Sequence, residues 1–347
     1  MTTSGQVSRS MNGTKARGFL TRHGFTVVLV GLIILYALIA PTFLTITNLL
    51  SLLHSAAPMM VIASGLAIVV MTGKIDISVG SVALLTTSVG TILMVRNGLD
   101  PLSTLVILLI MGLAIGFVNG ILVVGLRISP LIVTLAMMLI LRGIALELTK
   151  AMTIGLPEDI RRLGNLSIGP VFVDILIAIG IMLIMQLVLV RTPFGRRVVA
   201  IGNDIDTAAR LGIRVNRVTI ATFVVSSLLA TIGGVLTLVQ VGSSSSSIGS
   251  GLEFTAVSAV VIGGISLFGG EGSIVPGALR GVLILEIIRN GLNHIGADPY
   301  AYRLVNGAII FVAMYADSLR QRMMVPARTM DSDEPDVVSA PPVTTSP

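Results

Sequence analysis

Long apolar runs, separated by short polar or glycine-containing turns, are the feature that most constrains the fold of this 347-residue chain. A helix that crosses a bilayer needs about 20 mainly apolar residues, and runs of roughly that length recur between residues 24 and 315. Only 12% of the residues are charged, whereas soluble domains carry about 25%. The runs are continuous rather than alternating, which argues against a transmembrane β-barrel. The sequence therefore predicts an all-α polytopic membrane protein.

Division of the apolar runs at the turns predicts about ten transmembrane helices, some of them broken or re-entrant. Pro130 is placed to open one of them, because proline is tolerated in the first turn of a helix. The serine-rich segment 242–250 is expected to be a flexible outer linker from its composition. The predicted spans are 24–43, 49–71, 79–95, 102–126, 131–149, 171–190, 218–241, 252–268, 274–290 and 300–315.

The distribution of lysine and arginine predicts the orientation, because these residues favour the cytoplasmic side. They gather in the N-terminal tail 1–23, in the loop 191–217 and in the C-terminal tail, and an even number of spans places all three in the cytoplasm. The outer loop 150–170 is an exception, partly offset by its own acidic residues. We expect a cytoplasmic tail 1–23, a transmembrane domain 24–316 and a tail 317–347 of disordered type.

Several kinds of site are absent from the sequence. There is no cysteine and there are only three histidines, far apart, so disulfides, thiol catalysis and a histidine metal cluster are not expected. No catalytic signature and no G-x-x-x-x-G-K-[ST] phosphate loop occurs. The net charge of +6 lies in loops and tails, where orientation explains it without nucleic acid. We expect no enzyme activity and no bound cofactor or metal. If the protein uses ATP for transport, the ATPase must be a separate chain.

The segment TGKIDISVGS, residues 72–81, places an acidic residue between two apolar runs. A carboxylate there is costly unless it pairs, caps a helix or reaches water. Asp76 and Ser78 could cap the next helix, and Gly73 and Gly80 permit an abrupt change of chain direction. Broken helices of this kind often lie at transport sites. The alternative is an ordinary polar turn at the cytoplasmic surface.

Further polar residues occur within the predicted spans. Charged groups at such depth usually face a bundle interior or a cavity, although Glu286 can instead pair with Arg289 on one helix face. The glycine-rich segment 259–273 is mostly explained by close helix packing and a tight turn. Candidate residues of a substrate pathway are Asp76, Ser78, Asn119, Arg142, Glu253, Glu286 and Asn290.

The basic loop 191–217 predicts a short helix of about two turns. Asp204 or Asp206 can cap its beginning and Gly212 can end it. A topology signal alone would need only the arginines, so a capped helix indicates a docking surface for a cytoplasmic partner. Candidate docking residues are Arg196, Arg197, Asp204, Asp206, Arg210, Leu211 and Gly212.

Four stretches in matching order resemble the ribose-type permeases of bacterial ABC sugar importers. They are GKIDISVGS, SPLIVTLAMMLILRG, TPFGRRVVAIGNDIDTAARLGIRV and GLEFTAVSAVVIGGISLFGGEGSIVPGAL with RNGLNHIG, and the similarity runs from residue 42 to residue 315. Two departures are Lys74, where the family usually has glycine, and Leu211, where serine is common.

The resemblance implies a multi-pass permease subunit of about ten helices in the bacterial inner membrane. Two permeases, identical or paralogous, would form the pore. Two cytoplasmic ATP-binding domains, on separate chains or one fused double-domain chain, would use ATP and magnesium, and a periplasmic protein would deliver a sugar or sugar alcohol. The short helix near residues 206–211 would be the coupling helix seated in the ATPase.

The alternative function is an ion-coupled secondary transporter of a small polar solute. It would explain the intramembrane Asp76, Arg142 and Glu286 without any partner chain. Transport by this chain alone in an ion gradient distinguishes it from an ATP-driven importer.

Overall fold

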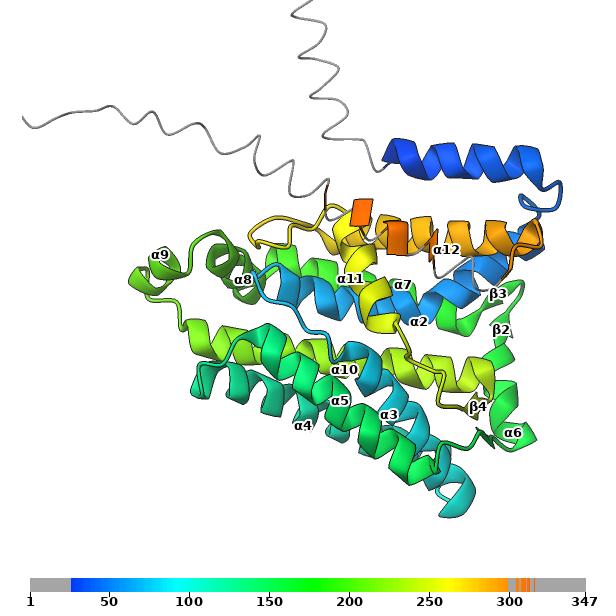
Figure 1. Ribbon diagram of the computed structural model, residues 1–347, viewed down its shortest axis with the longest axis horizontal. Coiled ribbons are helices and arrows are strands. Elements are labelled where there is room, and N and C mark those ends of the chain that lie inside the picture. Colours follow the sequence, from blue (N-terminus) through cyan, green and yellow to red (C-terminus); the bar gives the residue numbers. More distant parts are fainter. Residues whose placement is uncertain (1–25, 299–303, 306, 310, 313–314, 316–347) are drawn as a thin grey trace, which may run out of the picture.

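The computed structural model describes residues 26–298, 304–305, 307–309, 311–312 and 315, and its fold is a bundle of helices (Figure 1). The long helices are α2 (Ile46–Val70), α3 (Val79–Thr91) continued by the π-helical turn η1 (Ile92–Arg96), α4 (Pro101–Gly125), α5 (Pro130–Thr149), α7 (Val173–Arg191) and α10 (Val215–Val241). The shorter helices are α6 (Glu158–Arg161), α8 (Pro193–Asn203), α9 (Ile205–Arg210), α11 (Leu252–Ile262) and α12 (Leu279–His294).

Six helices of the described residues are long and apolar enough to cross a membrane: α2, α3 with η1, α4, α5, α7 and α10. They confirm the predicted spans 49–71, 79–95, 102–126, 131–149, 171–190 and 218–241 to within a few residues. The predicted span 24–43 contains the shorter apolar helix Thr26–Ile39. The tails 1–23 and 317–347 and most of the predicted span 300–315 lie outside the described residues.

The predicted span 252–268 is wrong in length. Helix α11 ends at Ile262, and the chain then turns through Gly264, Gly269 and Gly270, which have φ angles of 88°, 93° and 77°. Such left-handed conformations end a helix and suit glycine, which lacks a Cβ. The π-helical turn η3 (Ile274–Ala278) follows, so the regular helix α12 begins five residues later than predicted.

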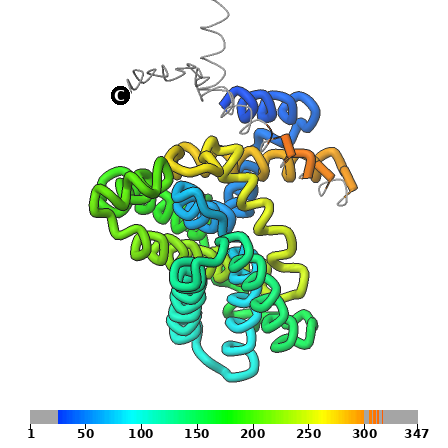
Figure 2. The backbone as a smooth tube through the Cα atoms, turned by 60° about the vertical axis from the view of Figure 1, so that its left-hand side comes forward, coloured from blue at the N-terminus to red at the C-terminus, as the bar shows by residue number. Residues whose placement is uncertain are grey.

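Helix α10 lies at the centre of the bundle, between α3 and α4 on one side and α2 on the other (Figures 1 and 2). Its approach to α4 is close because glycines replace side chains at the contact. A methyl group at Gly116 would lie 2.6 Å from the carbonyl oxygen of Phe223, and one at Gly120 would lie 2.8 Å from Cα of Ile220. Small residues four apart allow such backbone contact between membrane helices.

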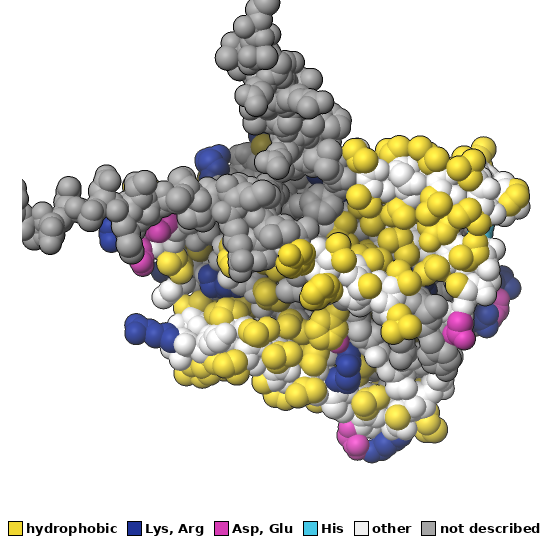
Figure 3. Space-filling model, turned by 45° about the horizontal axis from the view of Figure 1, so that its top comes forward, with side chains coloured by type: hydrophobic (Ala, Val, Ile, Leu, Met, Phe, Trp, Pro, Cys, Tyr) yellow, Lys and Arg dark blue, Asp and Glu magenta, His cyan; other side chains and the backbone are white. Residues whose placement is uncertain are grey.

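The outer faces of the bundle are apolar. In the most apolar 18-residue stretch of α2, 78% of the residues are buried, but in that of α5 only 22% are. Leu102, Ile132 and Leu139 are each more than 60% exposed. Figure 3 shows hydrophobic side chains over much of the visible face, with most charged side chains towards its margins. In water such a surface would aggregate, so it must contact lipid or another apolar protein surface.

Short strand pairs form at the end of the bundle opposite α8 and α9 (Figure 1). Strand β1 (Ile154–Gly155) pairs with β4 (Ser243–Ser244), and β2 (Ser167–Ile168) pairs with β3 (Val171–Phe172). The expectation that 242–250 is a flexible linker is therefore wrong for Ser243 and Ser244, which pair with β1. Ser244 is 1% exposed and its hydroxyl lies 3.4 Å from that of Thr87, because small serines let the segment pack on α3.

Candidate functional site

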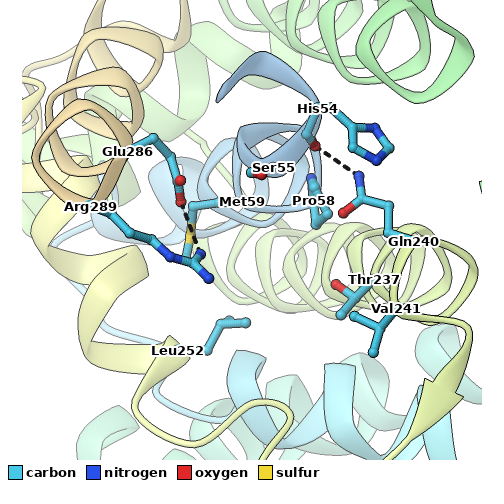
Figure 4. Close-up of a pocket in the computed structure, with 10 residues that line it drawn as sticks. All are labelled: His54, Ser55, Pro58, Met59, Thr237, Gln240, Val241, Leu252, Glu286 and Arg289. Carbon is cyan, nitrogen blue, oxygen red and sulfur yellow. Dashed lines mark hydrogen bonds and ion pairs between the residues drawn. The ribbon is translucent and has the colours of Figure 1, made fainter. Parts of the chain in front are cut away.

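A cavity of about 400 Å³ lies among α2, α10, α11 and α12 (Figure 4). Glu286 and Arg289 of α12 form one side, where their charged groups are 3.7 Å apart. On the other side, the Gln240 amide donates a 2.8 Å hydrogen bond to the carbonyl oxygen of His54. The lining residues are His54, Ser55, Pro58, Met59, Thr237, Gln240, Val241, Leu252, Glu286 and Arg289.

His54 links three helices at the edge of this cavity. Its Nδ1 lies 2.7 Å from Oδ2 of Asp174 in α7, and its ring stacks on Phe172 with centroids 4.2 Å apart. Gln240 of α10 also donates to Oδ2 of Asp174. None of these residues was predicted as a site residue from the sequence. The available signal was Asp174, a lone carboxylate in an apolar run, which requires a polar partner at that depth.

The charged side chains among the described residues that line the cavity are paired with each other. Glu286 faces Arg289, so a charged ligand would have to compete with an existing ion pair. Ser55 and Thr237 offer hydroxyl groups and Gln240 offers its amide oxygen, whereas Pro58 and Met59 offer apolar contact. A site of this volume that combines a few polar groups with apolar walls suits a small neutral molecule bearing hydroxyl groups.

A second polar cluster surrounds Asp76 deep in the bundle. One oxygen, Oδ1, accepts hydrogen bonds from the Ser78 amide at 3.0 Å and the Ser78 hydroxyl at 2.6 Å. The other, Oδ2, accepts from the Ser226 hydroxyl of α10 at 2.9 Å. Asn119 of α4 donates to Ser78 Oγ at 3.0 Å. The cluster therefore joins the α2–α3 connection to α4 and α10.

This arrangement corrects two expectations about residues 72–81. Asp76 is completely buried, so the alternative of a solvated surface turn is wrong. Ser78 occupies the N-cap position of α3 but makes no side-chain capping bond, because its hydroxyl donates to Asp76 instead. The abrupt change of direction at Gly73 is confirmed by its φ of 71°.

A third cluster joins α5 to the beginning of α11. Arg142 donates a 3.0 Å hydrogen bond to the carbonyl oxygen of Gly249 and lies 3.5 Å from Oε1 of Glu253. Glu253 is 2% exposed and packs directly over Gly80, where a methyl group would overlap its Oε2. Gly80 therefore lets the N-terminus of α3 approach the buried carboxylate of this ion pair.

The structure thus distributes the seven predicted pathway residues over four places. Asp76, Ser78 and Asn119 lie together, and Arg142 and Glu253 lie together. Glu286 lines the cavity with Arg289, which confirms the predicted pairing. Asn290 exchanges hydrogen bonds with Asn48 of α2 at 2.9 and 3.0 Å and is not among the residues that line the cavity. The pathway role of these residues remains a prediction.

At the opposite end of the bundle the loop 191–217 contains two helices. The carboxylate of Asp204 accepts a hydrogen bond from the Thr207 amide, which caps α9. The Gly212 amide donates to the Ala209 carbonyl at 3.0 Å and the Ile213 amide to Ala208 at 3.1 Å, which together form a Schellman motif. The predicted short helix ending at Gly212 is confirmed, with Asp204 rather than Asp206 as its cap.

Helix α8 was not predicted, although Thr192 followed by Pro193 is a typical beginning of a helix. Its arginines, Arg196 and Arg197, are exposed, as is Arg210 of α9. The Leu211 side chain, which follows α9, is 75% exposed. The end of the bundle therefore presents an apolar residue among cations, a suitable surface for a protein partner.

Comparison with known proteins identifies relatives along nearly the whole chain. Residues 48–314 match the family described as the branched-chain amino acid transport system / permease component. The ribose import permease of Escherichia coli K12 is 35% identical over 315 residues, covering 88% of this chain and 96% of the relative. That of Bacillus subtilis 168 is 33% identical, covering 82% and 89%.

The autoinducer 2 import system permease of Photorhabdus laumondii is 34% identical over 268 residues, covering 76% of this chain and 79% of the relative. No solved structure matches the chain. These relatives confirm the resemblance to ribose-type ABC permeases. With six helices among the described residues that are long and apolar enough to cross a membrane, the chain is a multi-pass inner-membrane protein and belongs to the family of ABC-transporter permease components.

Proposed function

We propose that the chain moves a monosaccharide, or a related sugar or sugar alcohol, inward across the bacterial inner membrane, driven by ATP hydrolysis in a separate subunit. The relatives named for ribose import support the solute class. The observation that carries the energy source is α9, a capped and exposed helix between α8 and α10. Both tails and the loop 191–217 are cytoplasmic in this proposal, because arginine and lysine gather there.

Helix α9 is the contact for the ATPase. Its two ends are fixed by the Asp204 cap and the Schellman motif, so the helix keeps its shape while Leu211 stays in solvent. A rigid, exposed apolar residue is an effective anchor for a partner's groove. The exposed arginines of α8 and α9 would complement acidic residues around that groove on the ATPase. ATP and magnesium are bound by the partner subunit, on one fused chain or two.

The cavity beside His54 is a candidate site for the solute inside each protomer. Its lining residue His54 stacks on Phe172 of β3, so the cavity lies toward the end of the bundle that carries the strand pairs. In this proposal that end faces the periplasm, where a binding protein would deliver the sugar. A sugar presents hydroxyl groups at its edge and C–H groups on its faces. Gln240, Thr237 and Ser55 match the first, and Met59 and Pro58 match the second. A second permease copy or paralogue completes the transporter.

Reconstitution tests the energy source. Proteoliposomes that hold the permease alone should not accumulate sugar under a proton or sodium gradient. Uptake should begin when the cognate ATPase, the binding protein and ATP are supplied. Uptake by the permease alone, driven by an ion gradient, would instead establish the secondary transporter.

Leu211→Asp tests the docking surface. The variant should insert normally but fail to co-purify with the ATPase, because a carboxylate then enters an apolar groove. Ile168→Asp is the matched control, since Ile168 is also exposed, at 67%, but lies at the opposite end of the bundle. Equal recovery of the ATPase with both variants would exclude α9 as the contact.

Thr237→Phe tests the cavity by filling it, and Thr237→Val is the control that keeps its volume. The Phe variant should lower the maximal uptake rate at least tenfold, since the sugar is excluded. The Val variant should stay within about threefold of wild type, the cost of one hydrogen bond. A Phe variant that transports normally would show that the sugar passes elsewhere.

A further inference from the structure

Three backbone segments meet at one point at the end of the bundle that carries α8 and α9. They are the end of α8 at Gly202, the end of α2 at Met71, and the turn at Gly269 and Gly270 that follows α11. The Gly270 amide donates a 2.9 Å hydrogen bond to the Met71 carbonyl oxygen. A methyl group at Gly202 would overlap that same oxygen and the Gly270 nitrogen. One at Gly269 would lie 2.8 Å from Cα of Gly202.

The glycine at position 202 is needed for space rather than for conformation. Gly269 and Gly270 have positive φ angles, but Gly202 lies within the helix α8, which ends at Asn203. Inside a helix, alanine is favoured over glycine by about 1 kcal/mol. A glycine at 202 is therefore locally unfavourable, and the contact it permits is backbone against backbone. Such contacts contain no side chain that could rotate out of the way, so a displacement of α8 would also displace the segments packed against it.

The turn after α11 is also attached to α7, the helix that precedes α8. Gln186 of α7 accepts hydrogen bonds from the amides of Ile274 and Val275 at 2.8 and 3.0 Å. Helix α7 runs directly into α8 through the tight corner at Thr192. The segment 268–275 is therefore fixed to α7 by Gln186 and to α8 by the glycine contact.

The contact among Gly202, Gly269 and Gly270 is also connected to the buried carboxylate of Asp76. Gly73 lies against the same turn, since a methyl group at Gly73 would be 3.1 Å from the carbonyl oxygen of Phe268. Asp76 follows three residues later and is hydrogen-bonded to Ser226 in α10. A displacement at α8 is thus connected by short, rigid contacts to the beginning of α3 and the middle of α10.

We infer that Gly202, with Gly269 and Gly270, is the positioning contact through which α8 and α9 move the end of α2 and the α11–α12 turn as one body. This inference rests on the proposed function, because it needs an ATPase that displaces α9. It gives a role to glycines of two motifs, residues 72–81 and 259–273, that are not themselves candidate site residues.

Gly202→Ala tests the inference in the complete complex with its ATPase and binding protein. The variant should co-purify with the ATPase as wild type does, yet lose at least tenfold of sugar uptake per ATP hydrolysed, because α8 is displaced from α2 and the turn. Gly180→Ala is the matched control: it is a helical glycine of α7 with nothing within 4 Å of the added methyl group. Normal coupling in Gly202→Ala would overturn the inference.

Gln186→Ala provides a second measurement that does not depend on how Gly202→Ala folds. It removes the acceptor for the amides of Ile274 and Val275, so the turn loses its attachment to α7. Uptake per ATP hydrolysed should fall in Gln186→Ala and should return toward wild type in Gln186→Glu, which keeps an acceptor oxygen at that position. Wild-type coupling in Gln186→Ala would overturn the inference.

The proposed function and the junction can fail separately. If wild-type complex shows no ATP-driven uptake, the proposed function fails. If wild type and Gly202→Ala transport equally well, only the junction fails.

Discussion

The carboxylate of Asp76 and the hydroxyl of Ser226 are 2.9 Å apart although the two residues are 150 positions apart in the chain. The bond connects the α2–α3 connection with the central helix α10. Asp76 has no exposed surface, so its oxygens depend on donors supplied by the protein.

Loss of either partner should weaken the fold. Ser226→Ala should destabilise the protein by about 1 kcal/mol, the net value of one hydrogen bond, and Asp76→Ala by more, because two Ser78 donors also lose their acceptor. Thermal unfolding in detergent measures both. An Asp76→Ala variant as stable as wild type would contradict the network.

The ion pair of Arg142 and Glu253 should show strong coupling in a double-mutant cycle. Arg142→Met leaves the Glu253 carboxylate, which is 2% exposed, without its cation, whereas Glu253→Gln leaves an arginine that is 27% exposed. Removal of one partner from a buried ion pair costs about 3–5 kcal/mol, so Arg142→Met should destabilise the protein more than Glu253→Gln does. The double variant Arg142→Met/Glu253→Gln should be destabilised by less than the sum of the two single changes. Thermal midpoints of wild type, the two single variants and the double variant give the coupling, and additive effects would argue against the pair.

Gly80→Ala should prevent normal packing of α3 on α11. The added methyl group would overlap the Glu253 carboxylate and lie 3.0 Å from the Gly249 carbonyl oxygen. We expect a clear loss of folded protein in the membrane, measured by size-exclusion chromatography after extraction. Gly31→Ala is the control, because nothing lies within 4 Å of that position. Equal yields from both variants would refute the close approach.

Asp204→Ala should weaken binding of the ATPase by about fivefold, since α9 loses its N-cap, whereas Asp204→Asn should retain most of the affinity. Binding of the purified ATPase to each variant in nanodiscs measures this. Wild-type affinity in Asp204→Ala would mean that α9 forms without its cap.

The same cap should be insensitive to pH near neutrality. The backbone hydrogen bond from Thr207 lowers the pKa of Asp204 below its ordinary value of 3.8. A lowered folded-state pKa means that the contribution to stability is complete above the ordinary value and is lost only as the pH falls through the lowered one. ATPase affinity of wild type and Asp204→Asn should thus follow parallel profiles between pH 6 and pH 8. Divergence in that range would contradict the assignment.

The sequence predicted the features that depend on neighbouring residues, such as helix ends and pairs within one helix. Pro130 marks the first residue of α5, and Gly212 closes α9, because each has a conformational preference that does not depend on distant residues. Glu286 and Arg289 pair because they are three apart on one helix. The expectation for the serine-rich segment 242–250 was wrong at Ser243 and Ser244. Its composition indicates flexibility, whereas the pairing of these two residues depends on the distant strand β1.

By itself, the sequence determined that the chain is a helical membrane protein with a short capped helix in its basic loop, because hydropathy, charge and capping are properties of neighbouring residues. Only the tertiary structure decided which polar residues meet. The partners in the three polar pairs are far apart in the sequence, so no helical periodicity predicts them. The pairs are Asp76 with Ser226, Arg142 with Glu253, and His54 with Asp174. In an apolar interior each polar group must find a partner, but the packing of the helices selects that partner.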